Sequence, residues 1–296
     1  EVQRKVVIEE FKQRYLNQPY GDVWLKLRPL AYQAHPYQWA TIGKEIKHIE
    51  DATVEDVKSF FYTHYVPSNA IMVVAGNVKT ENIKRLSEKW FGTIPSGKIK
   101  KRNLVKEPEQ KSKRTLEVKM DVPAAALYKA YHMPGRFDKD FYAADLVSDV
   151  LGRGDSSRLY QRLVKDNPIF NSVSAFTMGT IDPGLLIING RVRDGMDLRE
   201  AEKALDDVVY DFVEKGITDE ELEKVKNQAL STIEFGEVEV LNRAMNLAFS
   251  ALSGDANLVN RERGLIEAIE SKEIDRLAQQ ILKEENVSVL YYNTNN

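Results

Sequence analysis

The sequence predicts an α+β fold made of two duplicated two-layer lobes, each with a mostly antiparallel sheet and helices on one face, the first lobe being incomplete. Three observations lead to this prediction. Predicted helices and strands come in blocks rather than in strict alternation. A helix-and-strand pattern recurs late in the chain. A Lys-rich segment with few large apolar residues separates the two occurrences.

Size and composition narrow the possible classes of protein. The chain has 296 residues, more than the usual single domain, of which 43% are hydrophobic and 29% charged, with a formal net charge of −3. This balance argues against nucleic acid or an acidic membrane surface as the main partner. No cysteine is present, and no apolar run approaches the roughly 20 residues that a membrane span needs. Because the chain opens with Glu1 directly in a helical pattern, we expect the true N-terminus to lie elsewhere.

The first lobe is predicted to cover residues 1–97. Apolar residues at helical spacing predict helices over 2–16, 53–65 and 80–92, and "NAIMVVAGNV" at 69–78 predicts a buried strand. Residues 98–114 carry many Lys and Arg side chains and predict an exposed linker. A nucleic-acid patch is the other interpretation of this segment, but it offers no aromatic side chains for bases to stack on.

The second lobe is predicted to be complete and to cover residues 115–296. Alternating or continuous apolar runs predict strands at 115–122, 125–134, 170–178, 184–192 and 286–292. Helical spacing predicts helices at 140–152, 156–166, 198–215, 219–235, 240–252 and 271–282.

An internal repeat supports the duplication. "IEDATVEDVKSFF" at 49–61 aligns without gaps with "IESKEIDRLAQQI" at 269–281, an offset of 220. The same offset places the first helix over residues 221–235. The second copy has about 107 residues before that point, so we expect a segment of about that length to be missing from the first copy.

Two adjacent glutamates on the first helix are predicted to differ in role. On a helical wheel Glu9 falls among charged residues, whereas Glu10 falls at the margin of the apolar stripe, beside Gln3 and Arg14. A carboxylate in that position needs a partner. The wheel alone favours an ordinary helix ion pair with Arg14, four residues on.

Three stretches together resemble one family of enzymes. These are "RKVVIEEFKQR", the run "HPYQWATIGKEIKHIEDATVEDVKSFFYTHYVPSNAIMVVAGNV" and "LGRGDSSRLYQRL". The chain resembles the pitrilysin/insulinase family of inverted-zincin metallopeptidases over essentially its whole length, including the duplicated lobes.

The resemblance implies a role for Glu10. Members of the family bind zinc through the two histidines of an H-x-x-E-H helix and one downstream glutamate, and the glutamate within that motif acts as general base. The downstream ligand matches Glu10. A further family glutamate seven residues earlier is Gln3 here, which cannot act as an acid or base. Gln3 and Arg14 are therefore candidates only for supporting the metal ligand.

The histidines do not complete a zinc site. His35, His48, His64 and His132 stand in neither H-x-x-E-H nor H-E-x-x-H spacing. Because a catalytic zinc needs about three protein ligands, this chain alone is expected to hold no zinc and to hydrolyse no peptide bond. We predict zinc only in the full-length parent, and no catalytic residue within this chain.

The glycine-containing stretch "GRGDSSRLYQRL" at 152–163 is predicted to be a turn that opens a helix, capped by Asp155 or Ser156. An integrin-type Arg-Gly-Asp site and a phosphate-binding loop are the alternatives, but a lone tripeptide is unspecific and the P-loop lysine is absent. Just beyond, active family members carry an Arg and, seven residues later, a Tyr that contact substrate. Those positions are Val164 and Asn171 here.

These observations predict a fragment of a zinc metalloendopeptidase subunit acting on peptide substrates. It would pair as a homodimer, or as a heterodimer with a related subunit that supplies the Arg and Tyr. The alternative is a non-catalytic structural or partner subunit of the same family. A helical-repeat interaction module is the third interpretation, and the predicted strands and the long repeat period argue against it.

Overall fold

The computed structural model describes residues 1–99 and 103–295 and divides the chain into two compact units. The first unit contains Glu1–Glu50, Leu104–Lys226 and Ile269–Asn296. The second contains Asp51–Asn103 and Asn227–Ala268. Among the described residues, no helix combines the length and apolarity that crossing a membrane requires.

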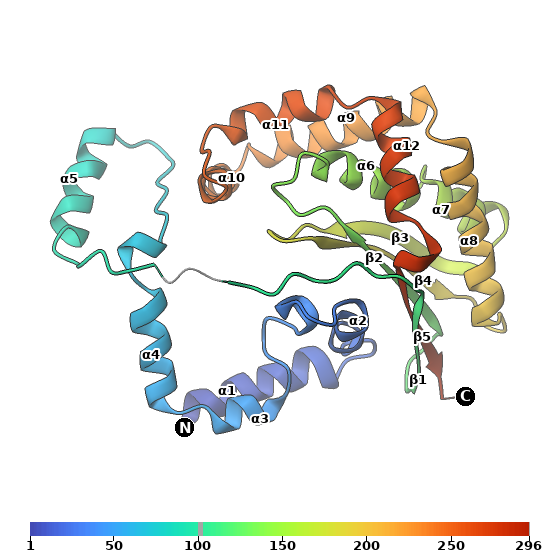
Figure 1. Cartoon of the computed structure of the whole chain (residues 1–296), viewed down its shortest axis with the longest axis horizontal. Coiled ribbons are helices and arrows are strands. Elements are labelled where there is room, and N and C mark those ends of the chain that lie inside the picture. The colour runs from blue at the N-terminus through green and yellow to red at the C-terminus, as the bar shows by residue number, and fades with distance from the viewer. Residues whose placement is uncertain (100–102, 296) are drawn as a thin grey trace. The chain divides into compact units, whose positions relative to one another are not determined.

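The first unit is organised around a five-stranded sheet (Figure 1). Its strands are β1 (Arg114–Met120), β2 (Ala126–Met133), β3 (Phe170–Met178), β4 (Gly184–Val192) and β5 (Val287–Thr294), in the order β1-β5-β2-β4-β3. Only β1 and β5 pair in parallel, and the other three pairings are antiparallel. In the centre, Tyr128 pairs with Asn189 on one side and Leu290 on the other. The predicted α+β class with a mostly antiparallel sheet is confirmed.

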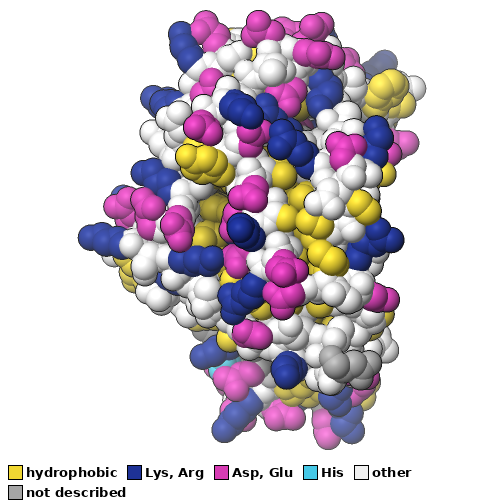
Figure 2. All heavy atoms as spheres, turned by 90° about the vertical axis from the view of Figure 1, so that its right-hand side faces the viewer, with side chains coloured by type: hydrophobic (Ala, Val, Ile, Leu, Met, Phe, Trp, Pro, Cys, Tyr) yellow, Lys and Arg dark blue, Asp and Glu magenta, His cyan; other side chains and the backbone are white. Residues whose placement is uncertain are grey.

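Three helices cover one face of this sheet: α6 (Phe141–Gly152), α8 (Leu198–Lys215) and α12 (Ser271–Ile281) (Figure 1). α6 is apolar around most of its circumference and is buried along nearly its whole length, as expected for a helix beneath other helices. α8 and α12 are amphipathic and bury one stripe each. Figure 2 shows the outer surface on the α8 side, where basic and acidic side chains intermingle.

The opposite face of the sheet is covered by α2 (Val23–Ala31), a helix that the sequence did not predict. Val23, Leu27 and Ala31 are buried in one core cluster with strand residues such as Tyr128 and Leu290. α2 is short and contains Pro29, a residue that disfavours helix, so the sequence did not indicate a helix there. It belongs to the segment predicted as the first lobe, yet it packs on the sheet predicted for the second.

The remaining helices mostly match their predicted positions. In the first unit these are α1 (Val2–Phe11) with a π-helical extension at Lys12–Leu16, α3 (Ile46–Asp51), and α7 (Arg158–Tyr160) with a π-helical extension at Gln161–Asp166. The second unit contains α4 (Val54–His64), α5 (Thr80–Phe91), α10 (Val240–Leu252) and α11 (Leu258–Glu267). α9 (Asp219–Gly236) crosses from one unit to the other. Like α2, α3 and α11 were not predicted.

The predicted strand at 69–78 does not form. Residues Pro67–Asn69 make a 3₁₀ turn, and the following residues are extended without strand pairing. Ile71, Met72 and Val74 are exposed rather than buried. A strand exists only where a neighbour accepts and donates its backbone hydrogen bonds, and the described residues provide none beside this segment.

The predicted Lys-rich linker is only partly free. Its residues 100–102 lie outside the described residues. Farther along, the Glu107 carboxylate accepts hydrogen bonds from the backbone N–H groups of Gln33, Ala34 and His35 at 2.8–2.9 Å. Gln110 is buried and donates to the carbonyl oxygen of Val287 at 2.8 Å. The second half of the linker is therefore fixed to the first unit.

The structure corrects the register of the internal repeat. Thr53 and Asp56 form a capping box at the start of α4, and Glu270 and Glu273 form one at the start of α12, 217 positions later (270 − 53). The 3₁₀ turn at Pro67–Asn69 has a counterpart at Glu284–Asn286 with the same offset (284 − 67). The first residue of α2, Val23, and the first residue of α10, Val240, are also 217 positions apart (240 − 23). The gapless offset of 220 was wrong here, because periodic apolar spacing tolerates a slip of about one helical turn.

Candidate functional site

Glu10 lies on α1 and forms an ion pair with Arg14, whose guanidinium nitrogen is 2.9 Å from the carboxylate. Its side chain is 45% exposed. Glu9 pairs separately with Lys12 at 2.7 Å. The predicted contact between Glu10 and Arg14 is therefore present. A solvent-exposed pair of this kind stabilises a helix only slightly and leaves the carboxylate accessible to another ligand.

The Glu9 side chain is 61% exposed and the Glu10 side chain 45%, so the two glutamates differ in burial in the direction that the wheel predicted. Both line a shallow hollow of about 530 Å³ on α1, whose other lining residues are Val2, Lys5, Val6 and Gln13. Gln3 is exposed and does not line this hollow. α1 buries only Phe11, but Val7, Ile8 and Glu10 are half-buried, so these residues mark the packed side of the helix.

The described residues supply no complete metal site. In residues 1–99 and 103–295, no group of three or more His, Asp or Glu side chains is placed to hold a metal ion. His132 contacts the carbonyl oxygen of Ala31 at 2.9 Å, and burial lowers its pKa. His35 is buried and accepts a hydrogen bond from the Tyr37 backbone N–H. Glu10 is thus at most one ligand of a zinc site whose other ligands would come from elsewhere.

The two positions that match the substrate-contacting pair lie near the edge strand β3. Val164 lies in the π-helical extension of α7. Asn171 lies at a register shift in β3, between Phe170 and Ser172, and its amide donates to the carbonyl oxygen of Val192 at 3.4 Å. Neither side chain can act as Arg or Tyr would. The bulge that turns Asn171 toward its neighbouring strand has no signal in the sequence.

The glycine-containing stretch forms the predicted turn, but its cap differs. The residue that precedes α7 is Ser157, not Asp155 or Ser156, and its hydroxyl donates to the carbonyl oxygen of Gly154 at 2.7 Å. Gly154 has a φ of 74°, which glycine adopts without strain. Placing the cap one or two residues early was wrong because Asp and Ser are equally good caps and the sequence offers three in a row.

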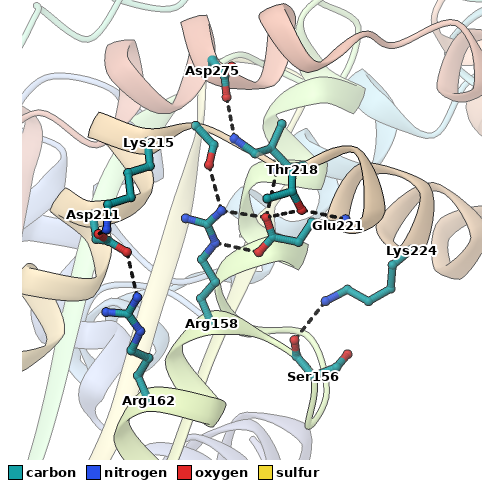
Figure 3. Close-up of polar contacts among 11 residues, drawn as sticks. Ser156, Arg158, Arg162, Asp211, Lys215, Thr218, Glu221, Lys224 and Asp275 are labelled. Atoms are coloured by element: carbon teal, nitrogen blue, oxygen red, sulfur yellow. Dashed lines mark hydrogen bonds and ion pairs between the residues drawn. The ribbon is translucent and has the colours of Figure 1, made fainter.

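The turn leads into a polar cluster that the sequence analysis missed (Figure 3). Arg158 makes a two-pronged ion pair with Glu221, with hydrogen bonds of 2.7 and 2.6 Å, and also donates to the carbonyl oxygen of Gly216 at 2.8 Å. Its guanidinium lies over the Phe212 ring. Arg158 therefore ties α7 to the connection between α8 and α9.

One part of this cluster, the capping box of Thr218 and Glu221, could have been predicted from the sequence. Thr218 and Glu221 form a capping box at the start of α9: the Glu221 N–H donates to the Thr218 hydroxyl, and the Thr218 N–H donates to the Glu221 carboxylate. This spacing, followed by an apolar run, is a recognisable helix start. The ion pair between Arg158 and Glu221 could not be predicted from the sequence, because 63 residues separate the two side chains.

We expect this cluster to make stability depend on pH. Burial alone would raise the pKa of the Glu221 carboxyl, but hydrogen bonds from Arg158 and Thr218 outweigh burial and lower the pKa from 4.5 to about 2. A carboxyl with a lowered folded-state pKa stabilises the fold above its unfolded pKa, and this contribution is lost as the pH falls from 4.5 to 2. Glu221→Gln should lower the free energy of unfolding at pH 7 by about 1–3 kcal/mol.

Urea unfolding at pH 7 and at pH 2.5, with Glu223→Gln as the matched control on the same helix, would measure this effect. The difference between Glu221→Gln and the parent should shrink at the lower pH. An equal difference at both pH values would contradict an ionised, paired Glu221.

The chain matches the family model described as "Peptidase M16 inactive domain" over residues 51–229. That is more than half of its length. The chain therefore belongs to the M16, or pitrilysin, family of peptidases, as the resemblance implied.

The similarity to individual relatives extends over most or nearly all of the chain. The sequence is 30% identical over 227 residues to a Helicobacter pylori protein named zinc protease PqqE, a match covering 76% of this chain and 51% of that protein. It is 23% identical over 279 residues to a probable mitochondrial-processing peptidase subunit beta of Arabidopsis thaliana, covering 86% and 51%. The fold superimposes on the crystal structure of a protease from Helicobacter pylori with a TM-score of 0.90 and 24% identity, covering 99% of this chain and 71% of that one. This chain spans about half the length of the two curated relatives.

Proposed function

We propose that this chain is the C-terminal part of a zinc metalloendopeptidase subunit, and that Glu10 is the metal ligand it contributes. The observation that carries the proposal is the accessible Glu10 carboxylate on α1, in a chain that belongs to the M16 family. A relative named zinc protease supports it. Zinc in such a site activates water for peptide-bond hydrolysis, and the histidines that complete the site would lie in a segment preceding Glu1.

The test compares Glu10→Gln with Glu9→Gln in the full-length gene product. The two residues are neighbours on α1, line the same hollow and each pair with one basic side chain, so Glu9 is a closely matched control. We expect Glu10→Gln to lose bound zinc, measured as metal-to-protein ratio, and to lose peptidase activity by about 100-fold or more, because one of three ligands is removed. Glu9→Gln should keep both.

If Glu10→Gln retained zinc and activity at the level of Glu9→Gln, Glu10 would be an ordinary helix carboxylate paired with Arg14. A full-length protein with neither zinc nor peptidase activity would support the second candidate, a non-catalytic subunit of the same family. Gln3, Val164 and Asn171 favour that candidate, because each replaces a side chain that active members use.

Val164 and Asn171 stand where active family members have Arg and Tyr, and this difference concerns which partner subunit the protein would need. We propose that the parent pairs with a related subunit that supplies these groups to a shared peptide-binding chamber, which would favour short or unfolded peptides. A homodimer is the other possible assembly. Efficient peptide cleavage by the full-length protein, purified alone as a homodimer, would contradict the heterodimer.

We also propose that residues 1–97 belong to a first lobe, 98–114 to a linker and 115–296 to a second lobe. An incomplete first lobe is supported by α4 and α5, which leave a largely apolar cavity of about 730 Å³. Phe60, Phe61, Met72 and Phe91 are among its lining residues. An apolar surface of this size on a folded domain normally packs against another part of the protein.

A further inference from the structure

The first unit contains a cavity of about 340 Å³ where α8 lies over β2 and the start of β5. Its apolar walls are formed by Val209 and Val213 of α8, by Leu282 after α12, and by Val287 of β5. Ligand pockets in proteins have volumes from about 300 Å³ upward, and a cavity of about 150 Å³ already takes a benzene molecule. The cavity is therefore large enough for a molecule with one ring and a polar substituent.

Two buried side chains of β2 give this cavity its polar side. Lys129 and Tyr131 both line it, and each is 2% exposed. They are two residues apart on one strand, so both point to the α8 face of the sheet. Lys129 forms ion pairs with Asp206 and Glu202. The Tyr131 hydroxyl forms no hydrogen bond with any residue that the structure describes. Because a buried hydroxyl without a partner is costly, we expect its partner to be a molecule in the cavity.

The Tyr131 hydroxyl is a hydrogen-bond donor at neutral pH. Burial, and next the carboxylates of Asp206 and Glu202, raise its pKa well above the usual value. Neither carboxylate accepts its proton. The Glu202 oxygens accept from two other donors at 2.7 and 2.6 Å, and Oδ1 of Asp206 pairs with Lys129. Oδ2 of Asp206 accepts no hydrogen bond from a described residue, and this side chain is 42% exposed. The cavity thus offers one donor and one acceptor.

The charges around the cavity favour a neutral ligand. The two lysines at the cavity are balanced by Glu202 and Asp206, and Glu284 adds one further negative charge to the lining. A carboxylate or phosphate group would therefore meet like charges without a free counter-charge. An ammonium group has no lone pair with which to accept from Tyr131. A hydroxyl group both accepts and donates, so it complements Tyr131 and Asp206 together.

We infer that this cavity binds a small neutral molecule with an apolar, one-ring body and one hydroxyl group, of which a simple phenol is the smallest example. The ligand hydroxyl accepts a hydrogen bond from Tyr131 and donates one to Asp206. The ring lies among the valine and leucine side chains of the walls. The inference does not rest on zinc binding by Glu10.

Titration of the full-length protein with p-cresol and with toluene tests this site. The shifts of labelled valine and leucine methyl groups, measured by NMR, give both the affinity and the location. Toluene has the same ring and methyl group as p-cresol but no hydroxyl, so p-cresol should bind about tenfold more tightly. Tyr131→Phe should lower this ratio about fivefold, because it removes one hydrogen bond and keeps the shape of the cavity. Val213→Phe, which fills the cavity, should abolish binding of both compounds.

Tyr128→Phe is the matched control, because Tyr128 lies on the same strand but belongs to the core cluster on the opposite face of the sheet. It should leave the ratio of the two affinities unchanged. Absence of methyl shifts around the cavity up to the solubility limit of p-cresol would overturn the inference and assign the Tyr131 hydroxyl to water alone. An equal change of the ratio in Tyr131→Phe and Tyr128→Phe would also overturn it.

Discussion

Replacing Gly152 with alanine is expected to destabilise the protein by about 3 kcal/mol or more, because the position has no room for a methyl group. Gly152 ends α6 where the helix meets β3. A Cβ atom there would overlap the backbone nitrogen of Ala175 and lie 2.6 Å from the Ala175 Cβ. Both obstacles belong to a paired strand, which cannot shift without losing its ladder of hydrogen bonds.

Gly264→Ala is the matched control for this substitution. Gly264 also lies in a helix, but no atom lies within 4 Å of its added Cβ, and alanine there should raise the free energy of unfolding by about 0.5–1 kcal/mol. Urea unfolding of both variants measures the contrast. Equal effects would show that α6 and β3 are less closely packed than the structure indicates.

Replacing Lys129 with methionine is expected to cost about 1–3 kcal/mol, because Glu202, whose side chain is 9% exposed, and Asp206, whose side chain is 42% exposed, both lose a positively charged partner. Lys129 lies in the centre of β2 with a side chain only 2% exposed, and it forms ion pairs with Asp206 and Glu202 of α8. Glu202 keeps two other partners, Lys113 at 2.7 Å and the Tyr291 hydroxyl at 2.6 Å. Asp206 is therefore the carboxylate that loses most.

A double-mutant cycle separates the lost charge pair from lost packing. Lys129→Met combined with Asp206→Leu should recover much of the stability, because replacing both partners removes the unpaired charge. Burial already raises the pKa of Asp206, so lowering the pH should also reduce the cost of Lys129→Met by protonating the carboxyl. If Lys129→Met alone stayed within about 1 kcal/mol of the parent, a charged Lys129 that stabilises the fold through these carboxylates would be contradicted.

The helices and strands of the first unit were largely predictable, because their side-chain periods are local properties of the chain. The five strands at 114–294 and the helices at α6, α8 and α12 follow from periods of about 2 and 3.6 residues. α2 was not predictable, because nine residues interrupted by Pro29 carry too little periodicity. The strand expected at 69–78 did not form, because its composition specifies a strand only when another strand lies beside it.

The contacts around the candidate site also differ in whether the sequence could predict them. Glu10 and its partner Arg14 are four residues apart on one helix, so their contact was predictable from spacing. The metal role of Glu10 came from resemblance to a family and stays a prediction. The ion pairs Arg158–Glu221 and Lys129–Asp206 join residues far apart in sequence, and no local pattern indicates them.

The sequence by itself determined the periodic elements, the family and the lack of a complete histidine motif, because each depends on residue types at fixed short spacings. Only the tertiary structure decided that α2 covers the sheet of the first unit, that the repeat is offset by 217 rather than 220, and that Glu107 and Gln110 fix residues 103–114 to that unit. These depend on which distant segment satisfies a buried backbone group, a charge or an apolar face. That choice is made by the whole fold, because the free energy of burial depends on the partner and not on the neighbouring residues in sequence.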